Sequence, residues 1–142
     1  MPARSLDWLR QAERDLLHAR KDLEDGFYEW ACFSAQQAAE KALKGLYQSL
    51  NRLAWGHSVT ALLEGLKDAF AAEDFLEGAK MLDKYYIPAR YPNGFDLGAP
   101  MDYFTEKEAT EAIAYADQII RFCKDNLPRR RRGSKETEKG RR

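Results

Sequence analysis

The sequence of 142 residues has few side chains that build metal centres and lacks a long apolar run. Its two cysteines, Cys32 and Cys123, and its two histidines do not have the spacing of metal ligands. We therefore expect no metal site, no cofactor and two buried free thiols. No stretch approaches the roughly 20 apolar residues that cross a membrane, and the first residues lack an apolar signal-peptide core. These absences predict a cytoplasmic protein without a membrane partner.

Neither sign of charge dominates the whole chain, because 23 Lys and Arg balance 23 Asp and Glu. The charges are nevertheless divided unevenly: residues 128–142 hold eight Lys or Arg and two Glu, a net +6, so residues 1–127 carry −6. We predict one domain over 1–127 and a basic, disordered tail over 128–142. The tail could attract phosphates or simply keep the protein in solution, whereas the acidic body is unsuited to gripping nucleic acid over its whole surface.

Apolar residues recur at helical spacing through most of the chain, and no segment shows the period-two alternation of a strand. Two patterns resemble capping boxes, Asp74 with Glu77 and Thr105 with Glu108. Helices are expected to begin near Ser5, Glu29, Ser58, Asp74 and Thr105, with the fourth ending at Pro88 and the last at Leu127. The fold class is therefore all-α, an up-and-down antiparallel bundle of about five helices.

The second expected helix, over residues 29–50, has two different faces. One arc is mostly alanine, so a neighbouring helix can approach it closely, and the opposite arc carries glutamines, Glu40, Lys41 and Lys44. Phe33 and Tyr47 fall near this polar arc, where a solvated helix face does not need aromatic rings. Their position favours a dimer interface.

The stretch YYIPARYPNGFD, residues 85–96, opens a long loop that is unusually rich in aromatic side chains. The planar guanidinium of Arg90 suits a phosphate, and neighbouring tyrosines provide stacking faces and hydroxyl donors. This combination suits a nucleotide or single-stranded RNA. The candidate ligand-binding residues are Arg90, Tyr91, Tyr85 and Tyr86 from the loop and Lys41 and Lys44 from the second helix. Alternatively, Arg90 pairs with an acidic residue and the rings belong to the core.

A second candidate site consists of Arg52 and His57, which have the spacing R-x4-H. A neutral histidine can take the proton of a ribose 2′-hydroxyl, and an arginine can stabilise the phosphorane that follows. This pair would be the catalytic site of a metal-independent ribonuclease. The spacing also arises often by chance, and His57 next to Ser58 at a helix start can be a capping or packing residue.

The segments FSAQQAAEKALKGLY, GHS and YYIPARYPNG, followed by an amphipathic helix, resemble the HEPN domain family over about residues 5–127. The resemblance implies a prokaryotic helical bundle that forms a homodimer and acts with a minimal nucleotidyltransferase in a toxin–antitoxin-like pair. Many members of the wider superfamily are ribonucleases with an R-x4-6-H motif on a late helix. Here the late helix has Arg121 but no histidine after it, so the chain departs from that pattern.

These observations leave three functional hypotheses open. The first is a dimeric module that binds a nucleotide or nucleic acid and acts with a minimal nucleotidyltransferase. The second is a ribonuclease toxin that uses Arg52 and His57. The third is a structural scaffold whose loop only shapes a dimer interface.

Overall fold

The computed structural model describes residues 4–128, which form helices joined by turns and contain no strand. The helices, including two short 3-10 turns, are α1 (Ser5–Glu24), α2 (Tyr28–Ser49), α3 (Val59–Glu64), η1 (Glu73–Phe75), α4 (Leu76–Asp83), η2 (Pro92–Gly94), α5 (Pro100–Tyr103) and α6 (Glu106–Asn126). The predicted all-α bundle is confirmed. Within this range, no helix is both long and apolar enough to cross a membrane.

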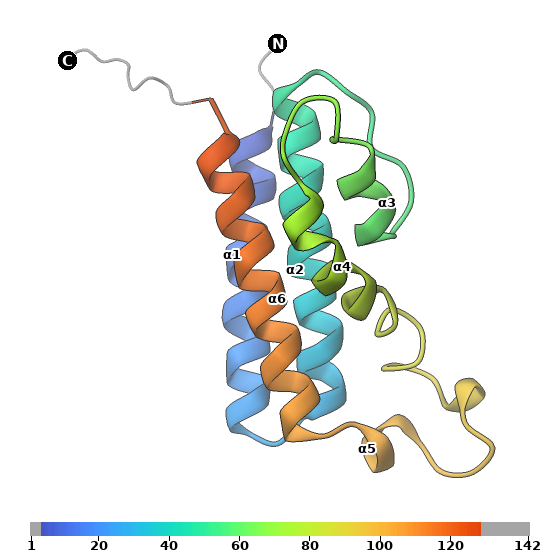
Figure 1. Ribbon diagram of the computed structural model, residues 1–142. Helices are drawn as coiled ribbons and strands as arrows, with labels where there is room; N and C mark the ends of the chain where they lie inside the picture. Colours follow the sequence, from blue (N-terminus) through green and yellow to red (C-terminus); the bar gives the residue numbers. More distant parts are fainter. Residues whose placement is uncertain (1–3, 129–142) are drawn as a thin grey trace.

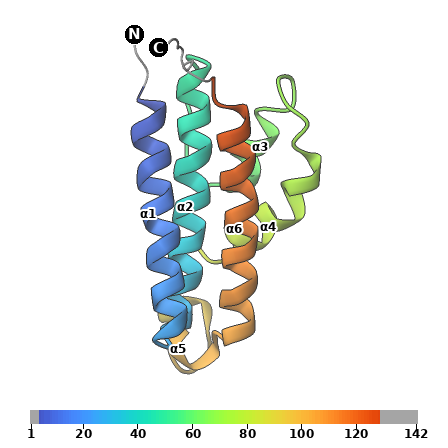
Figure 2. The same cartoon turned by 90° about the vertical axis from the view of Figure 1, so that its left-hand side faces the viewer.

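Three long helices, α1, α2 and α6, lie side by side and form the body of the molecule (Figures 1 and 2). α1 runs antiparallel to α2, as the short turn between them requires. The segment from α3 to α5 then returns the chain to the end of the bundle where α2 begins (Figure 1). Because of this return, α6 runs in the same direction as α2, with α3 and α4 packed beside them.

The core depends on small side chains that let the long helices approach each other. The alanine-rich arc of α2 is fully buried, as predicted, and consists of Ala31, Ala35, Ala38, Ala39 and Ala42. Gly45 continues this arc, since an added Cβ there would lie 3.0 Å from the backbone oxygen of Ser5 and 3.1 Å from Cβ of Trp8. A larger residue at position 45 would therefore push α1 away from α2.

Two of the predicted helix starts form as expected. The Thr105 hydroxyl accepts from the backbone N–H of Glu108, whose carboxylate accepts in return from the N–H of Thr105. The Ser58 hydroxyl accepts from the N–H of Ala61 at the start of α3. The first is a reciprocal capping box and the second is a single side-chain cap, as these sequences favour.

The capping box predicted at Asp74 and Glu77 does not form. Asp74 lies within a 3-10 turn, and α4 begins only at Leu76, without a side-chain cap. α4 also ends at Asp83, before the predicted stop at Pro88, and residues 84–90 form turns. The carboxylate of Asp83 instead accepts from the N–H groups of Val59 and Thr60, at 2.7 and 3.1 Å. This contact between α4 and α3 is tertiary, so local sequence patterns did not indicate it.

The third predicted helix begins at Val59 and has only six residues. It ends at Glu64, and the chain continues in turns to Phe70. α5, inside the predicted loop, was not predicted at all. α6 ends at Asn126, next to the predicted domain boundary at 127, but the basic tail lies outside the described residues from 129 on.

The position of Tyr47 near the polar arc of α2 is explained by contacts within one chain. Tyr47 is buried, and its hydroxyl donates to the carbonyl of Leu62 at 2.7 Å. An added Cβ at Gly65 would lie 2.1 Å from this hydroxyl, so a side chain there would displace Tyr47 where α3 ends against α2. The position of Tyr47 therefore reflects packing of α3 on α2, and the homodimer stays a prediction.

Candidate nucleotide-binding surface

Arg90 occupies the centre of a cluster of aromatic rings between α2 and the turns that follow α4. Its Nε donates to the carbonyl of Tyr86 at 2.8 Å. Its guanidinium carbon lies 4.4 Å from the ring centre of Phe33, 4.7 Å from that of Tyr86 and 5.1 Å from that of Tyr91. These distances are typical of cation–π contacts, which hold the guanidinium against the rings.

His57 and Trp30 extend this cluster on two sides. The imidazole of His57 stacks on the ring of Tyr86, with 4.8 Å between centres and 17° between planes. Trp30 meets Phe33 edge to face at 6.1 Å, and Trp30 and Tyr91 are each nearly half exposed. We call these six residues the Tyr86 cluster: Trp30, Phe33, His57, Tyr86, Arg90 and Tyr91.

Beneath the cluster, the carboxylate of Glu40 is buried on α2 and surrounded by hydrogen-bond donors. Lys44 Nζ donates to Oε2 at 2.9 Å, and Gln36 Nε2 donates to Oε1 at 3.1 Å. His57 Nδ1 lies 3.1 Å from the same Oε2. Burial alone would raise the pKa of Glu40, but the hydrogen bonds from Lys44, His57 and Gln36 bring the pKa below its ordinary value. Glu40 is therefore an anion at neutral pH.

Gln36 ties this carboxylate to the segment that carries His57. Its Nε2 donates to the backbone carbonyl of His57 at 3.0 Å as well as to Glu40. Its Oε1 accepts from Gln37 Nε2 at 2.8 Å, which fixes the orientation of the Gln36 amide. His57 is thus held at its ring by Glu40 and at its backbone by Gln36.

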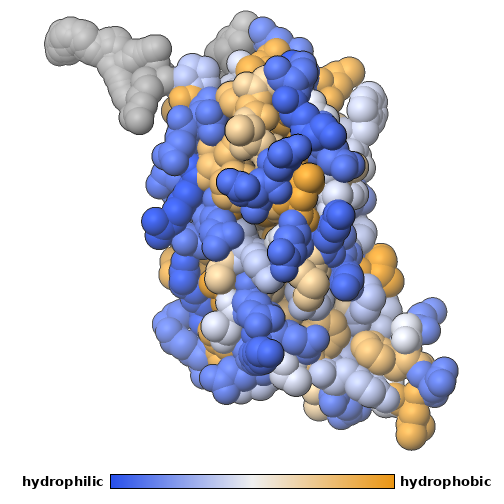
Figure 3. Space-filling view, viewed as in Figure 1, coloured by the Kyte–Doolittle hydropathy of each residue, from blue (hydrophilic) through white to orange (hydrophobic). Residues whose placement is uncertain are grey.

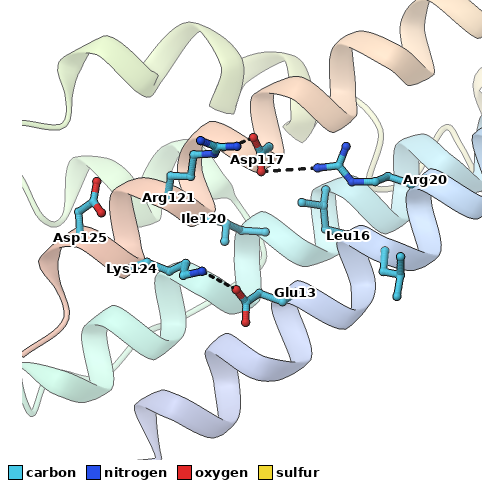
Figure 4. Close-up of a pocket in the computed structure, with 9 residues that line it drawn as sticks. Glu13, Leu16, Arg20, Asp117, Ile120, Arg121, Lys124 and Asp125 are labelled. Atoms are coloured by element: carbon cyan, nitrogen blue, oxygen red, sulfur yellow. Dashed lines mark hydrogen bonds and ion pairs between the residues drawn. The ribbon is translucent and has the colours of Figure 1, made fainter. Parts of the chain in front are cut away.

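A separate groove of about 470 Å³ lies between α1 and α6 (Figure 4). Leu16, Leu17 and Ile120 form its apolar floor. Two ion pairs cross the groove, Lys124 with Glu13 at 2.9 Å and Arg20 with Asp117 at 3.6 Å. Because these charges already have partners, the groove offers a ligand less than the Tyr86 cluster does.

The comparisons with known proteins place the chain in one family. A model of the HEPN domain matches residues 5–126. The chain belongs to the HEPN domain family. A crystal structure of a Thermus thermophilus protein is 48% identical, with a TM-score of 0.86, and the match covers 89% of this chain and all of that one. A solved archaeal HEPN homologue is 43% identical, with a TM-score of 0.76 and coverage of 90% and 100%.

Two further relatives extend the comparison. A HEPN domain protein from Thermotoga maritima is 42% identical, with a TM-score of 0.70 and coverage of 85% of this chain and 97% of its own. A "putative toxin" of Methanocaldococcus jannaschii is 23% identical over 130 residues, which is 84% of this chain and 86% of that protein.

In this HEPN domain, the structure brings together five of the predicted site residues. Arg90, Tyr86, Tyr91 and His57 belong to the Tyr86 cluster, and Lys44 reaches it through Glu40. Tyr85 points elsewhere: it is buried in the core, 5.6 Å from the ring of Phe104, and burial raises its pKa. Lys41 pairs with Asp15 of α1 at 2.5 Å.

Arg52 has a different set of partners from His57. Its two terminal nitrogens bind the carboxylate of Asp68 at 3.0 and 2.7 Å, and one of them also donates to the carbonyl of Gly65. The hydrogen bond to Asp68 raises the pKa of Arg52. The ring of His57 contacts Glu40 and Tyr86 instead. The catalytic pairing of Arg52 and His57 stays a prediction.

Sequence reasoning missed Glu40, Gln36, Trp30 and Phe33 as parts of the site. The polar residues were interpreted as a solvated helix face, although Gln36, Glu40 and Lys44 follow each other at i, i+4 spacing. That spacing, together with Phe33 on the same side of α2, was the available signal. It could be recognised only with the position of His57 known.

The two cysteines are not part of this surface. Cys32 and Cys123 are buried free thiols, and burial raises the pKa of Cys32 to about 12. Within residues 4–128, no three His, Cys, Asp or Glu side chains are grouped so that they could hold a metal ion.

Proposed function

We propose that this HEPN domain binds a nucleotide or nucleic acid through the Tyr86 cluster, and that it acts as a toxin-like member of a pair with a minimal nucleotidyltransferase. The observation that supports binding is the environment of Arg90. Within the described part of the chain, its guanidinium contacts aromatic rings and a backbone carbonyl rather than a carboxylate. The alternative in which Arg90 pairs with an acidic residue therefore has no support among those contacts.

The geometry leaves Arg90 able to bind a phosphate. Arginine has five N–H donors, and the bond to the carbonyl of Tyr86 uses only Nε. The surrounding rings fix the position of the guanidinium, so the loss of entropy on binding a phosphate is reduced. A site that is rigid before the ligand arrives binds it more tightly.

The rings of the Tyr86 cluster provide the second half of a nucleotide site. Trp30 and Tyr91 are each nearly half exposed, so both can contact a base. Stacking of a base on an aromatic side chain contributes about 1–3 kcal/mol and tolerates any base. We therefore expect a ligand with a base and a phosphate, and weak preference among the four bases.

The proposed protein partners rest on different evidence. A segment over residues 91–104 projects from the bundle, and it carries apolar surface at its tip (Figures 1 and 3). Leu97 and Met101 in this segment are 81% and 70% exposed. Exposed apolar side chains of this size suit contact with another protein, either a second copy or the nucleotidyltransferase. The toxin-like role is suggested by the relative from Methanocaldococcus jannaschii.

Binding is tested by calorimetry with AMP, ATP and a short single-stranded RNA. We expect binding of at least one of them, and we expect Arg90→Ala to weaken it at least tenfold. Arg10→Ala is a matched control, because Arg10 is an exposed arginine of α1 outside the cluster. Absence of binding, or equal effects of the two substitutions, would contradict the proposal. Light scattering of the purified chain tests the homodimer.

A further inference from the structure

The pair formed by Glu40 and His57 determines which nitrogen of the imidazole carries the proton. An ionised carboxylate can only accept hydrogen bonds. The other groups on the Glu40 oxygens are all donors, as an anion requires: Lys44 Nζ, Gln36 Nε2 and, at 3.5 Å, Gln37 Nε2. His57 Nδ1, at 3.1 Å from Oε2, must therefore donate as well.

The outer nitrogen of His57 consequently has a defined role. When Nδ1 of a neutral imidazole holds the proton, Nε2 has a free lone pair and acts as an acceptor. Among residues 4–128, Nε2 has no hydrogen-bond partner, and the His57 side chain is 56% exposed. An acceptor is therefore presented to solvent next to the stacked ring of Tyr86.

This acceptor belongs to the same cluster as the groups suited to a base and a phosphate. In a nucleotide the ribose joins the base to the phosphate. The aromatic rings suit the base, Arg90 suits the phosphate, and both Arg90 and His57 contact the ring of Tyr86. We propose that His57 Nε2 accepts a hydrogen bond from the ribose 2′-hydroxyl, so that the site prefers ribonucleotides to deoxyribonucleotides. The proposal rests on the proposed function and adds its sugar specificity.

Glu40 is then a positioning residue, since it acts on the ligand only through His57. It fixes the ring orientation and the tautomer, while Gln36 fixes the backbone of His57. The 2′-hydroxyl is the group by which proteins generally distinguish RNA from DNA. The sequence AQQAAEKALK thus has a physical role: it supplies Gln36, Glu40 and Lys44, which form the hydrogen-bond network that holds His57.

The test compares oligoadenylate in ribose and in deoxyribose form, of equal length and with the same 5′ fluorescent label, by fluorescence anisotropy. One hydrogen bond predicts that the RNA binds about two- to tenfold more tightly than the DNA. His57→Phe keeps an aromatic ring to stack on Tyr86 but removes Nε2. We expect this variant to bind DNA as the parent does and to lose the preference for RNA.

A second variant tests the positioning role of Glu40. Glu40→Gln has nearly the same shape but can donate as well as accept, so it no longer fixes the tautomer of His57. We expect a smaller ratio of RNA to DNA affinity and a change in the nitrogen chemical shifts of His57, measured by NMR. Thermal unfolding followed by circular dichroism shows whether Glu40→Gln is folded. If it is not, His57→Phe still tests the proposal.

The outcomes separate this inference from the proposed function. If RNA and DNA bind equally well, and Arg90→Ala weakens both, the binding function stands and the role of His57 is wrong. A preference for RNA that persists in His57→Phe also overturns the inference. If neither oligonucleotide nor free nucleotide binds, the proposed function fails and the inference fails with it.

Discussion

The guanidinium of Arg90 lies over the ring of Phe33, with 4.4 Å between its carbon and the ring centre. Phe33 is part of the first half of α2, whereas Arg90 belongs to the turns after α4. The contact therefore joins two of the sequence segments that resemble the HEPN family, FSAQQAAEKALKGLY and YYIPARYPNG. It also converts two local features, an aromatic residue on a polar helix face and an arginine in a loop, into one surface.

We predict that Arg90→Lys weakens ligand binding although it keeps the positive charge. A lysine ammonium has no planar face to stack on Phe33 and Tyr86, and it cannot bind phosphate through two parallel N–H groups. Stability should also fall, by about 0.5–1 kcal/mol, because an exposed cation–π contact contributes about that much. Calorimetric titration and urea unfolding measure the two effects. Arg90→Lys binding as tightly as the parent would show that only charge matters.

A second prediction concerns stability at low pH. The pKa of Glu40 in the folded protein is below its ordinary value of 4.5, so the folded state holds the ionised form more firmly than the unfolded chain does. Its contribution is fully present above about pH 4.5 and is lost as the pH falls through the lowered pKa. The parent should therefore lose more stability than Glu40→Gln does between pH 6 and pH 3.

The measurement is urea unfolding of both proteins across this pH range. The difference in unfolding free energy isolates Glu40, because the other carboxylates titrate in both proteins. We expect the difference to shrink towards low pH. A difference that stays constant would mean that folding leaves the pKa of Glu40 unchanged. A difference that grows towards low pH would mean that folding favours protonated Glu40, which would also remove the argument for the tautomer of His57.

The extent to which the sequence predicted the molecule differs between the bundle and the site. The stripes of α1, α2 and α6 were predictable because the burial of one helix face is a local pattern with a period of 3.6 residues. The cap at Thr105 was predictable for the same reason, since both partners lie within four residues. The contact of Asp83 with the start of α3 was not predictable, because Asp83 lies on α4 and its partner Val59 lies on another helix.

The site was only half predictable. Arg90 and Tyr86 stood out by their composition, and both belong to the cluster. Glu40 did not stand out, because a glutamate among lysines and glutamines on a helix is usually solvated. Only the fold shows that His57, from the segment after α2, lies over it. Conversely, Arg52 and His57 matched a motif in sequence, while their side chains bind different partners.

A third prediction tests the tertiary cap of α3. Asp83→Ala removes an acceptor for the N–H groups of Val59 and Thr60, and α3 has few turns of its own to compensate. We expect a loss of about 1–3 kcal/mol in unfolding free energy. Ser58→Ala, which removes the bond from the N–H of Ala61 and the bond that the hydroxyl donates to Asp83, should cost about 1 kcal/mol. Thermal or urea unfolding of both variants checks the order, and equal losses would contradict the role of Asp83.

The last prediction concerns RNA cleavage by Arg52 and His57. Cleavage of this kind needs an arginine that can turn to the charged phosphorane. The Arg52 guanidinium is held by two bonds to Asp68 and one to the carbonyl of Gly65, so three of its five donors already have partners. We therefore expect a labelled RNA to remain intact after incubation with the purified chain in EDTA, when followed on a denaturing gel. Cleavage that disappears in both Arg52→Ala and His57→Ala would establish the ribonuclease instead. Cleavage that depends on His57 and Arg90, but not on Arg52, would assign the chemistry to the Tyr86 cluster.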